Sequence, residues 1–189
     1  MSNVERMRPL DAAAMSAAQR AAAAELAAGP RGGVKGPFIA LLRSPELMDR
    51  LQKVGEYLRF RSSLEPRISE FLMLVVSRLW TQQFEWCVHV PLALKAGVRR
   101  ETVESLAAGS RPAAMAADEA IAYDFCAELM QTKGVSDATY RGALDQFGER
   151  GIVDMLGVLG YFTTVSMVLN VAHTPAAAPD VPPLQPLPL

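Results

Sequence analysis

Residues 66–97, PRISEFLMLVVSRLWTQQFEWCVHVPLALKAG, decide the fold that we expect for this chain. Pro66 suits the first turn of a helix, and the run that follows it is apolar and lacks strand-like alternation. Gly97 closes the stretch and suits the left-handed position that follows a helix. The stretch therefore predicts two consecutive helices, one that opens after Pro66 and one that ends at Gly97.

Helical signals continue on both sides of this pair, and no segment alternates for long enough to predict a sheet. The composition agrees, because 50% of the residues are hydrophobic, alanine is abundant and only 7% are aromatic. The fold class that we predict is all-α. Glycine and proline stops place the further helices at residues 11–28, 45–59, 100–108, 115–132, 136–148 and 150–172.

The sequence divides into three parts by composition. Residues 1–35 are expected to form an alanine-rich helix and a glycine-rich loop, and residues 36–173 the main helical domain. Residues 174–189 read TPAAAPDVPPLQPLPL, and this proline content is incompatible with a helix. We expect the tail to be either disordered or an extended arm laid over a neighbouring subunit.

Charge and cysteine content point to a cytoplasmic protein with neither a nucleic acid nor a membrane as partner. The net charge of the 189 residues is −1, so no basic field attracts nucleic acid or anionic lipid. Two cysteines suit a reducing compartment, and the first residues lack an apolar signal core. Residues 152–172 are long enough to span a membrane, but Asp154 and Asn170 would be costly in lipid. A helix buried in the core or in a subunit interface is expected there.

The second helix of the pair carries the candidate chemistry. Each helical residue advances by about 100°, so Gln82, Glu85 and His89 share one face at spacings i, i+3 and i+7. Trp86 borders that face, three residues before the histidine. Cys87 lies about 200° away from both Glu85 and His89 on the helix, so the histidine is poorly placed to activate its thiol.

Glu70, on the first helix of the pair, is either exposed beside Arg67 or turned into a cavity. Next to His89 it would form a carboxylate–histidine couple that holds and delivers a proton near neutral pH. Simpler interpretations exist: a structural histidine, a surface pair with Glu85, and Trp86 as plain core. No phosphate loop, serine elbow or zinc spacing is present, and two histidines make a poor metal site.

The segments EPRISEFLMLVVSRLW and QFEWCVHVPLALKAGV, residues 65–80 and 83–98, resemble the carboxymuconolactone decarboxylase family. That family shares its fold with the alkylhydroperoxidase D-like proteins. Similar segments upstream and downstream extend the resemblance to about residues 36–172. It implies a bundle of about seven or eight helices that is an obligate homo-oligomer, a trimer or a hexamer.

The peroxidase branch of this superfamily carries a glutamate and then C-x-x-C-x-x-x-H. Matched on His89, the pattern places Glu70 at the family glutamate, and Gln82 and Glu85 where the two cysteines stand. Cys87 is out of register with both. A disulfide cycle needs both thiols, so the chain is similar to the branch that lacks them.

The decarboxylase branch implies removal of carbon dioxide from a carboxylated muconolactone, in bacterial breakdown of aromatic acids, with no cofactor. The resemblance then implies His89 as acid/base and Glu70 and Glu85 as its partners. Gln82 and Trp86 would contact substrate. Either Arg67 or Arg78 is a candidate to hold a carboxylate.

Three functions stay open on sequence alone. The first is cofactor-free lyase or proton-transfer chemistry on a small carboxylated lactone or related acid, centred on His89. The second is a thiol peroxidase, with peroxiredoxin-type activity, that uses Cys87 or Cys126. The third is a non-catalytic oligomeric protein that binds a small ligand. The position of Cys87 and the presence of a cavity beside His89 distinguish them.

Overall fold

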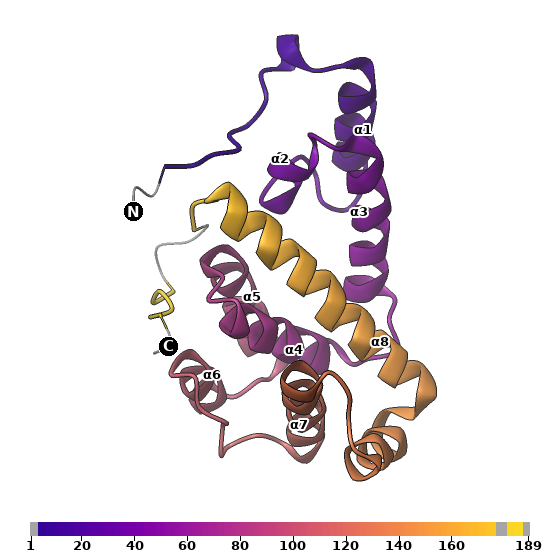
Figure 1. The fold of residues 1–189 in the computed structure, drawn as a ribbon, viewed down its shortest axis with the longest axis vertical. Coiled ribbons are helices and arrows are strands. Elements are labelled where there is room, and N and C mark those ends of the chain that lie inside the picture. Colours follow the sequence, from indigo (N-terminus) through magenta and orange to yellow (C-terminus); the bar gives the residue numbers. More distant parts are fainter. Residues whose placement is uncertain (1–3, 177–180, 187–189) are drawn as a thin grey trace.

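The computed structural model describes residues 4–176 and 181–186, and the described chain is all-α (Figure 1). A 3₁₀ turn, Ala12–Ala14, precedes eight α-helices. The long helix α8 crosses the molecule, with α4 and α5 along one side and α1, α2 and α3 on the other (Figure 1). The helices are α1 Ala17–Ala28, α2 Pro37–Leu41, α3 Pro45–Phe60, α4 Pro66–Leu79, α5 Gln83–Ala96, α6 Arg100–Ala107, α7 Ala117–Thr132 and α8 Asp137–Ala172.

The predicted helix pair is α4 and α5, which pack closely against each other. Gly97 ends α5 with φ 103°, the left-handed position predicted for it. The apolar run of α4 is continuous because this helix is buried all round, between α5, α7 and α8. Its fully buried side chains are Phe71, Leu72, Met73, Leu74 and Val76.

The N-terminal segment differs from the single helix predicted over residues 11–28. It forms the short 3₁₀ turn and then α1, because Ser16 starts a new helix with a capping box. The hydroxyl of Ser16 accepts from Gln19 N at 3.2 Å, and the Gln19 side chain accepts from Ser16 N at 2.9 Å.

The helix α2 was not predicted, since residues 29–38 were expected to form a loop. Pro37 occupies its first turn, where the missing N–H costs nothing. Phe38 and Leu41 are buried against α3 and α8, so tertiary packing stabilises this five-residue helix. This packing anchors the end of the loop between α1 and α2 against α3 and α8.

The predicted boundary at Gly148 is present as a break inside α8. Its φ of 66° and ψ of 173° interrupt the helix there. By length and composition α8 could cross a membrane, yet 56% of its most apolar window is buried within the fold. Asp154 is satisfied inside that window, because it accepts from Tyr57 Oη at 2.9 Å and from Ser63 N and Oγ, both at 2.7 Å.

Part of the proline-rich tail lies on its own chain. The Gln83 side chain accepts from Leu184 N at 2.9 Å and donates to Leu184 O at 2.7 Å, and Leu184 is buried. Arg78 donates to Gln185 O at 2.8 Å. Residues 181–186 therefore pack against α4 and α5 of their own chain. Residues 177–180 and 187–189 of the predicted tail lie outside the described residues.

Candidate active site

A histidine held between two carboxylates forms the centre of the candidate site. His89 Nδ1 lies 2.6 Å from Glu70 Oε2, and His89 Nε2 lies 3.3 Å from Glu85 Oε2. The histidine is 2% exposed and Glu85 is 5% exposed. The structure therefore brings together the three residues predicted as catalytic, and the carboxylate–histidine couple with Glu70 is present.

The three groups meet because of local helix geometry and one helix pairing. Glu85 and His89 are four residues apart on α5, which puts them on neighbouring turns of one face. Glu70 comes from α4, which packs along α5. Arg67 does not compete for Glu70, because its guanidinium pairs with Asp118 and with Glu119, the latter at 2.7 Å.

The site favours the protonated histidine. Burial alone would lower the pKa of His89, but the hydrogen bonds and charges of Glu70 and Glu85 outweigh it and raise the pKa to about 9. At neutral pH, His89 is therefore an imidazolium with both N–H groups directed at carboxylates. His89 therefore already carries the proton that it would donate.

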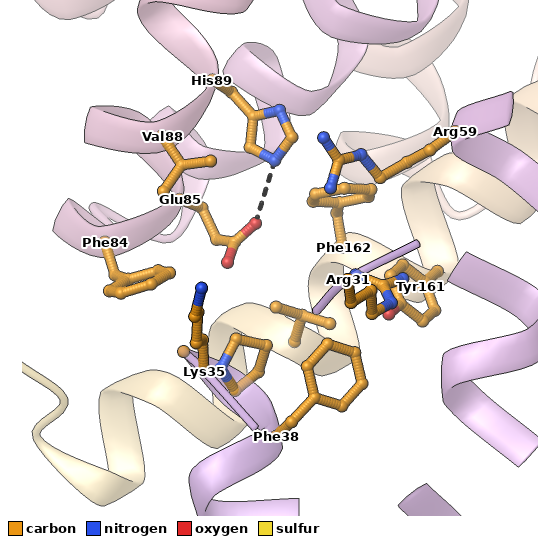
Figure 2. Close-up of a pocket in the computed structure, with 13 residues that line it drawn as sticks. Arg31, Lys35, Phe38, Arg59, Phe84, Glu85, Val88, His89, Tyr161 and Phe162 are labelled. Carbon is orange, nitrogen blue, oxygen red and sulfur yellow. Dashed lines mark ion pairs between the residues drawn. The ribbon is translucent and has the colours of Figure 1, made fainter. Parts of the chain in front are cut away.

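The imidazole opens on a cavity of about 160 Å³ (Figure 2). Glu85 and His89 form one wall, and Phe162 from α8 stands edge-on to the imidazole with ring centroids 5.2 Å apart. Glu70 does not line the cavity and contacts the histidine from the other side. The remaining lining residues are Arg31, Lys35, Gly36, Pro37, Phe38, Arg59, Phe84, Val88, Tyr161 and Val165.

Three basic side chains in this lining were not predicted as site residues from the sequence. Arg31 and Lys35 come from the loop between α1 and α2, and Arg59 comes from the last turn of α3. Figure 2 shows Arg31 beside Tyr161, and the amine of Lys35 directed toward the carboxylate of Glu85. The sequence signal available was a pair of basic residues within a glycine-rich loop, RGGVKG, which has no periodicity to tie it to α5.

Gln82 and Trp86 lie away from this cavity, although both were predicted to contact substrate. Gln82 is the N-cap of α5: its Oε1 accepts from Phe84 N at 2.5 Å and from Glu85 N at 3.1 Å. Its Nε2 donates to Asn170 Oδ1 at 3.0 Å. Trp86 is 2% exposed and belongs to the main core. Both residues thus support α5, and neither lines the wall that carries His89.

The cysteines and the two arginines considered for carboxylate binding are also placed elsewhere. Cys87 is buried and does not line the His89 cavity. Cys126 lies in the core, where burial raises the pKa of its thiol to about 12. Arg67 is engaged by acidic residues of α7, and Arg78 is buried and bonded to the tail. Within the described residues, no group of three or more His, Cys, Asp and Glu side chains is arranged to hold a metal ion.

Comparisons with known proteins find similar folds and a family match that includes the pair of helices α4 and α5. The model of the carboxymuconolactone decarboxylase family matches residues 45–125. A crystal structure described as an alkylhydroperoxidase AhpD core, an uncharacterized peroxidase-related protein of Ralstonia eutropha JMP134, superposes with a TM-score of 0.71. It shares 15% sequence identity, and the match covers 88% of each chain.

A second similar structure is an uncharacterized peroxidase-related protein of Silicibacter sp. TM1040, with a TM-score of 0.68 and 16% identity. The match covers 91% of this chain and 93% of that one. No curated protein matches the chain. At these identities the structures establish the fold, and the family model covers α3 to most of α7, including the helices that carry Glu70, Glu85 and His89. The chain therefore resembles the carboxymuconolactone decarboxylase family over residues 45–125, and its fold is that of the alkylhydroperoxidase D-like proteins.

Proposed function

We propose that the protein is a cofactor-free lyase or proton-transfer enzyme that acts on a small carboxylated lactone or a related acid. The observation that carries this proposal is the buried Glu70–His89–Glu85 arrangement, which opens on a cavity through His89 Nε2 and Glu85. A protonated histidine beside a ligand-sized space has what a general acid needs: a proton, a fixed direction and little water.

The chemistry follows from the position of the proton. Loss of carbon dioxide breaks a carbon–carbon bond and leaves its electron pair on the α-carbon, where the lactone carbonyl delocalises the pair as an enolate. The imidazolium of His89 then gives its Nε2 proton to that carbon, and solvent returns a proton to the histidine. The long contact to Glu85, 3.3 Å, leaves the Nε2 proton available to a substrate that approaches from the cavity. Glu70 holds the ring by Nδ1 throughout.

A thiol peroxidase is the alternative suggested by the peroxidase-related neighbours, but the site gives it less support. The positions of the two redox cysteines are Gln82 and Glu85, and Cys87 does not line the cavity. A ligand-binding protein without chemistry would not need a protonated histidine held between two carboxylates at the cavity wall. The balance of these observations favours proton transfer.

A panel of small carboxylated lactones and related unsaturated acids, incubated with the protein in D₂O, tests the proposal. We expect one or more to lose carbon dioxide or to take up deuterium at carbon, observed by NMR, because the histidine exchanges its proton with solvent. The Cys87→Ser variant should give the same rates. Consumption of hydrogen peroxide with a thiol reductant by the wild type, but not by Cys87→Ser, would contradict the proposal and support the peroxidase.

The homotrimer or hexamer implied by the family resemblance remains a prediction, and α8 offers a surface for it. Four large apolar side chains spaced along α8 are exposed, Val153 at 65%, Leu156 at 42%, Met167 at 42% and Val171 at 55%. A row of this kind on a single helix suits a second copy of the same helix better than it suits water.

We therefore expect the double variant Leu156→Glu, Met167→Glu to have a lower molar mass than the wild type by light scattering after size exclusion. A charge on each side chain would be buried without a partner in the assembled state. Leu47→Glu, a matched change at an exposed leucine of α3, should keep the wild-type mass. A wild type that is monomeric at all concentrations would contradict this prediction.

A further inference from the structure

Three basic side chains around the cavity are not held in an ion pair with a carboxylate. Within the described residues, Arg31, Lys35 and Arg59 take part in none of the ion pairs. The acidic residue nearest to them in the lining, Glu85, is engaged by His89. The cavity therefore has an excess of positive charge that the protein itself leaves unbalanced.

The two arginines also have buried donors that are unused. Nε and Nη2 of Arg31 and Nε of Arg59 are shielded from solvent and donate no hydrogen bond within the described residues. An unsatisfied buried donor on a charged group is costly, and native proteins seldom keep one without a reason. Burial lowers the pKa of Arg31, and the charge of Arg59 lowers it further, while Tyr161 and two glutamates act in the opposite direction without reversing the shift. A bound anion would accept hydrogen bonds from the unused donors and would offset the repulsion between the two guanidinium groups.

The neighbouring residues leave space for the guanidinium of Arg31 beside α3 and support it there. A Cβ on Gly55 of α3 would lie 2.3 Å from Tyr161 Oη and 2.7 Å from Arg31 Nη2, so a larger residue there would displace these groups. Phe38 supports the guanidinium from its ring face, with Arg31 Cζ 4.5 Å from the centroid. Arg31 is thus held against α3 and α8 and is not a loop side chain free in solvent.

The size and lining of the cavity restrict the anion that it can hold. An apolar cavity of about 150 Å³ in another protein holds benzene, so about 160 Å³ suits a ligand built on one small ring. Phe84 and Phe162 and the side chains of Val88 and Val165 line it and suit a flat, unsaturated body. The arginine fork matches a carboxylate with two parallel hydrogen bonds.

We infer that Arg31 and Arg59 form a carboxylate-binding subsite that holds a compact, unsaturated ring acid against His89. This inference rests on the proposed function, because it takes the His89 cavity as the substrate site, and it names the substrate class and the residues that select it. Arg31 lies outside the part of the chain that the family model matches, residues 45–125. The N-terminal segment of this chain, which carries Arg31 and Lys35, therefore sets the charge that its substrate must have.

Binding of benzoate, measured by calorimetry or by ligand-observed NMR, tests the subsite without any need for turnover. We expect the wild type to bind benzoate and to bind benzamide, its neutral isostere, at least about tenfold more weakly, since each charge-assisted hydrogen bond to a guanidinium is lost or weakened. Arg31→Met and Arg59→Met should each weaken benzoate binding by about ten- to a hundredfold. Arg50→Met, at an exposed arginine of α3, is the matched control and should bind as the wild type does.

Folding of the variants has its own expected result. Arg31→Met removes a partly buried charge whose Nε and Nη2 donate no hydrogen bond, so its melting temperature should equal or exceed that of the wild type. Arg59→Lys keeps the charge but loses the fork and should bind benzoate at an intermediate strength.

Three results would overturn the subsite: no benzoate binding by the wild type at millimolar concentration, equal binding of benzoate and benzamide, or equal binding by the two Arg→Met variants and the wild type. Inorganic phosphate that binds as tightly as benzoate would overturn the assignment to a carboxylate.

The proposed function can fail independently of the subsite. If benzoate binds through Arg31 and Arg59 but no acid in the panel is turned over, the subsite stands and the lyase proposal falls. If an acid is turned over with an unchanged KM in the arginine variants, the lyase proposal stands and the subsite falls.

Discussion

Replacement of His89 with glutamine should lower kcat on an acid substrate by about 10²- to 10⁴-fold, the usual contribution of a positioned general acid. Glutamine approximates the size and polarity of the imidazole but has no proton to give at neutral pH. KM should stay within a small factor of the wild-type value, because the carboxylate is held by Arg31 and Arg59 on other elements. Steady-state kinetics on the first substrate found in the D₂O panel provide the measurement.

The Glu70→Gln variant separates proton donation from mere packing. Glu70 contacts only the Nδ1 side of the histidine and does not line the cavity, so it acts as a positioning residue. Loss of its charge should lower the pKa of His89 from about 9, and the upper limb of the pH–rate profile should move to lower pH. Full activity in His89→Gln, or an unmoved profile in Glu70→Gln, would contradict the assignment of His89 as the acid.

The sequence was sufficient to predict the part of the site that depends on local geometry. Glu85 and His89 lie four residues apart, and a helix of any origin puts such residues on neighbouring turns. The helix itself was predictable from Pro66, the apolar run and Gly97, which the structure confirms as the bounds of the pair. Glu70 required more, because two helices had to pair in one register, and the family resemblance supplied that register.

The basic half of the cavity was not predictable, because it depends on contacts between distant segments. Arg31 follows α1, Arg59 ends α3 and Tyr161 belongs to α8, so no spacing in the chain relates them. Gln82 shows the opposite error. It lies on the same helical face as Glu85 and His89, yet its position at the start of α5 commits its amide to the N-cap and to Asn170. A helical wheel gives the face of a residue but not its place along the axis relative to a cavity.

The free energy of unfolding should depend on pH through the same histidine. The folded protein holds the pKa of His89 at about 9, against 6.5 for an unperturbed histidine. A group whose pKa is raised on folding stabilises the protein fully below its unfolded pKa, and the contribution is lost as the pH rises through the folded value. About 3 kcal/mol of stability should therefore be present below pH 6.5 and disappear as the pH passes 9.

Urea unfolding of the wild type and of His89→Gln across this range measures the effect. The wild type should lose stability between pH 6.5 and pH 9, and the difference between the two proteins should shrink over the same interval because only the wild type binds the extra proton. Parallel pH dependence in the wild type and in His89→Gln would mean that the imidazole is not charged in the folded protein. The acid would then have to be sought elsewhere along the cavity wall.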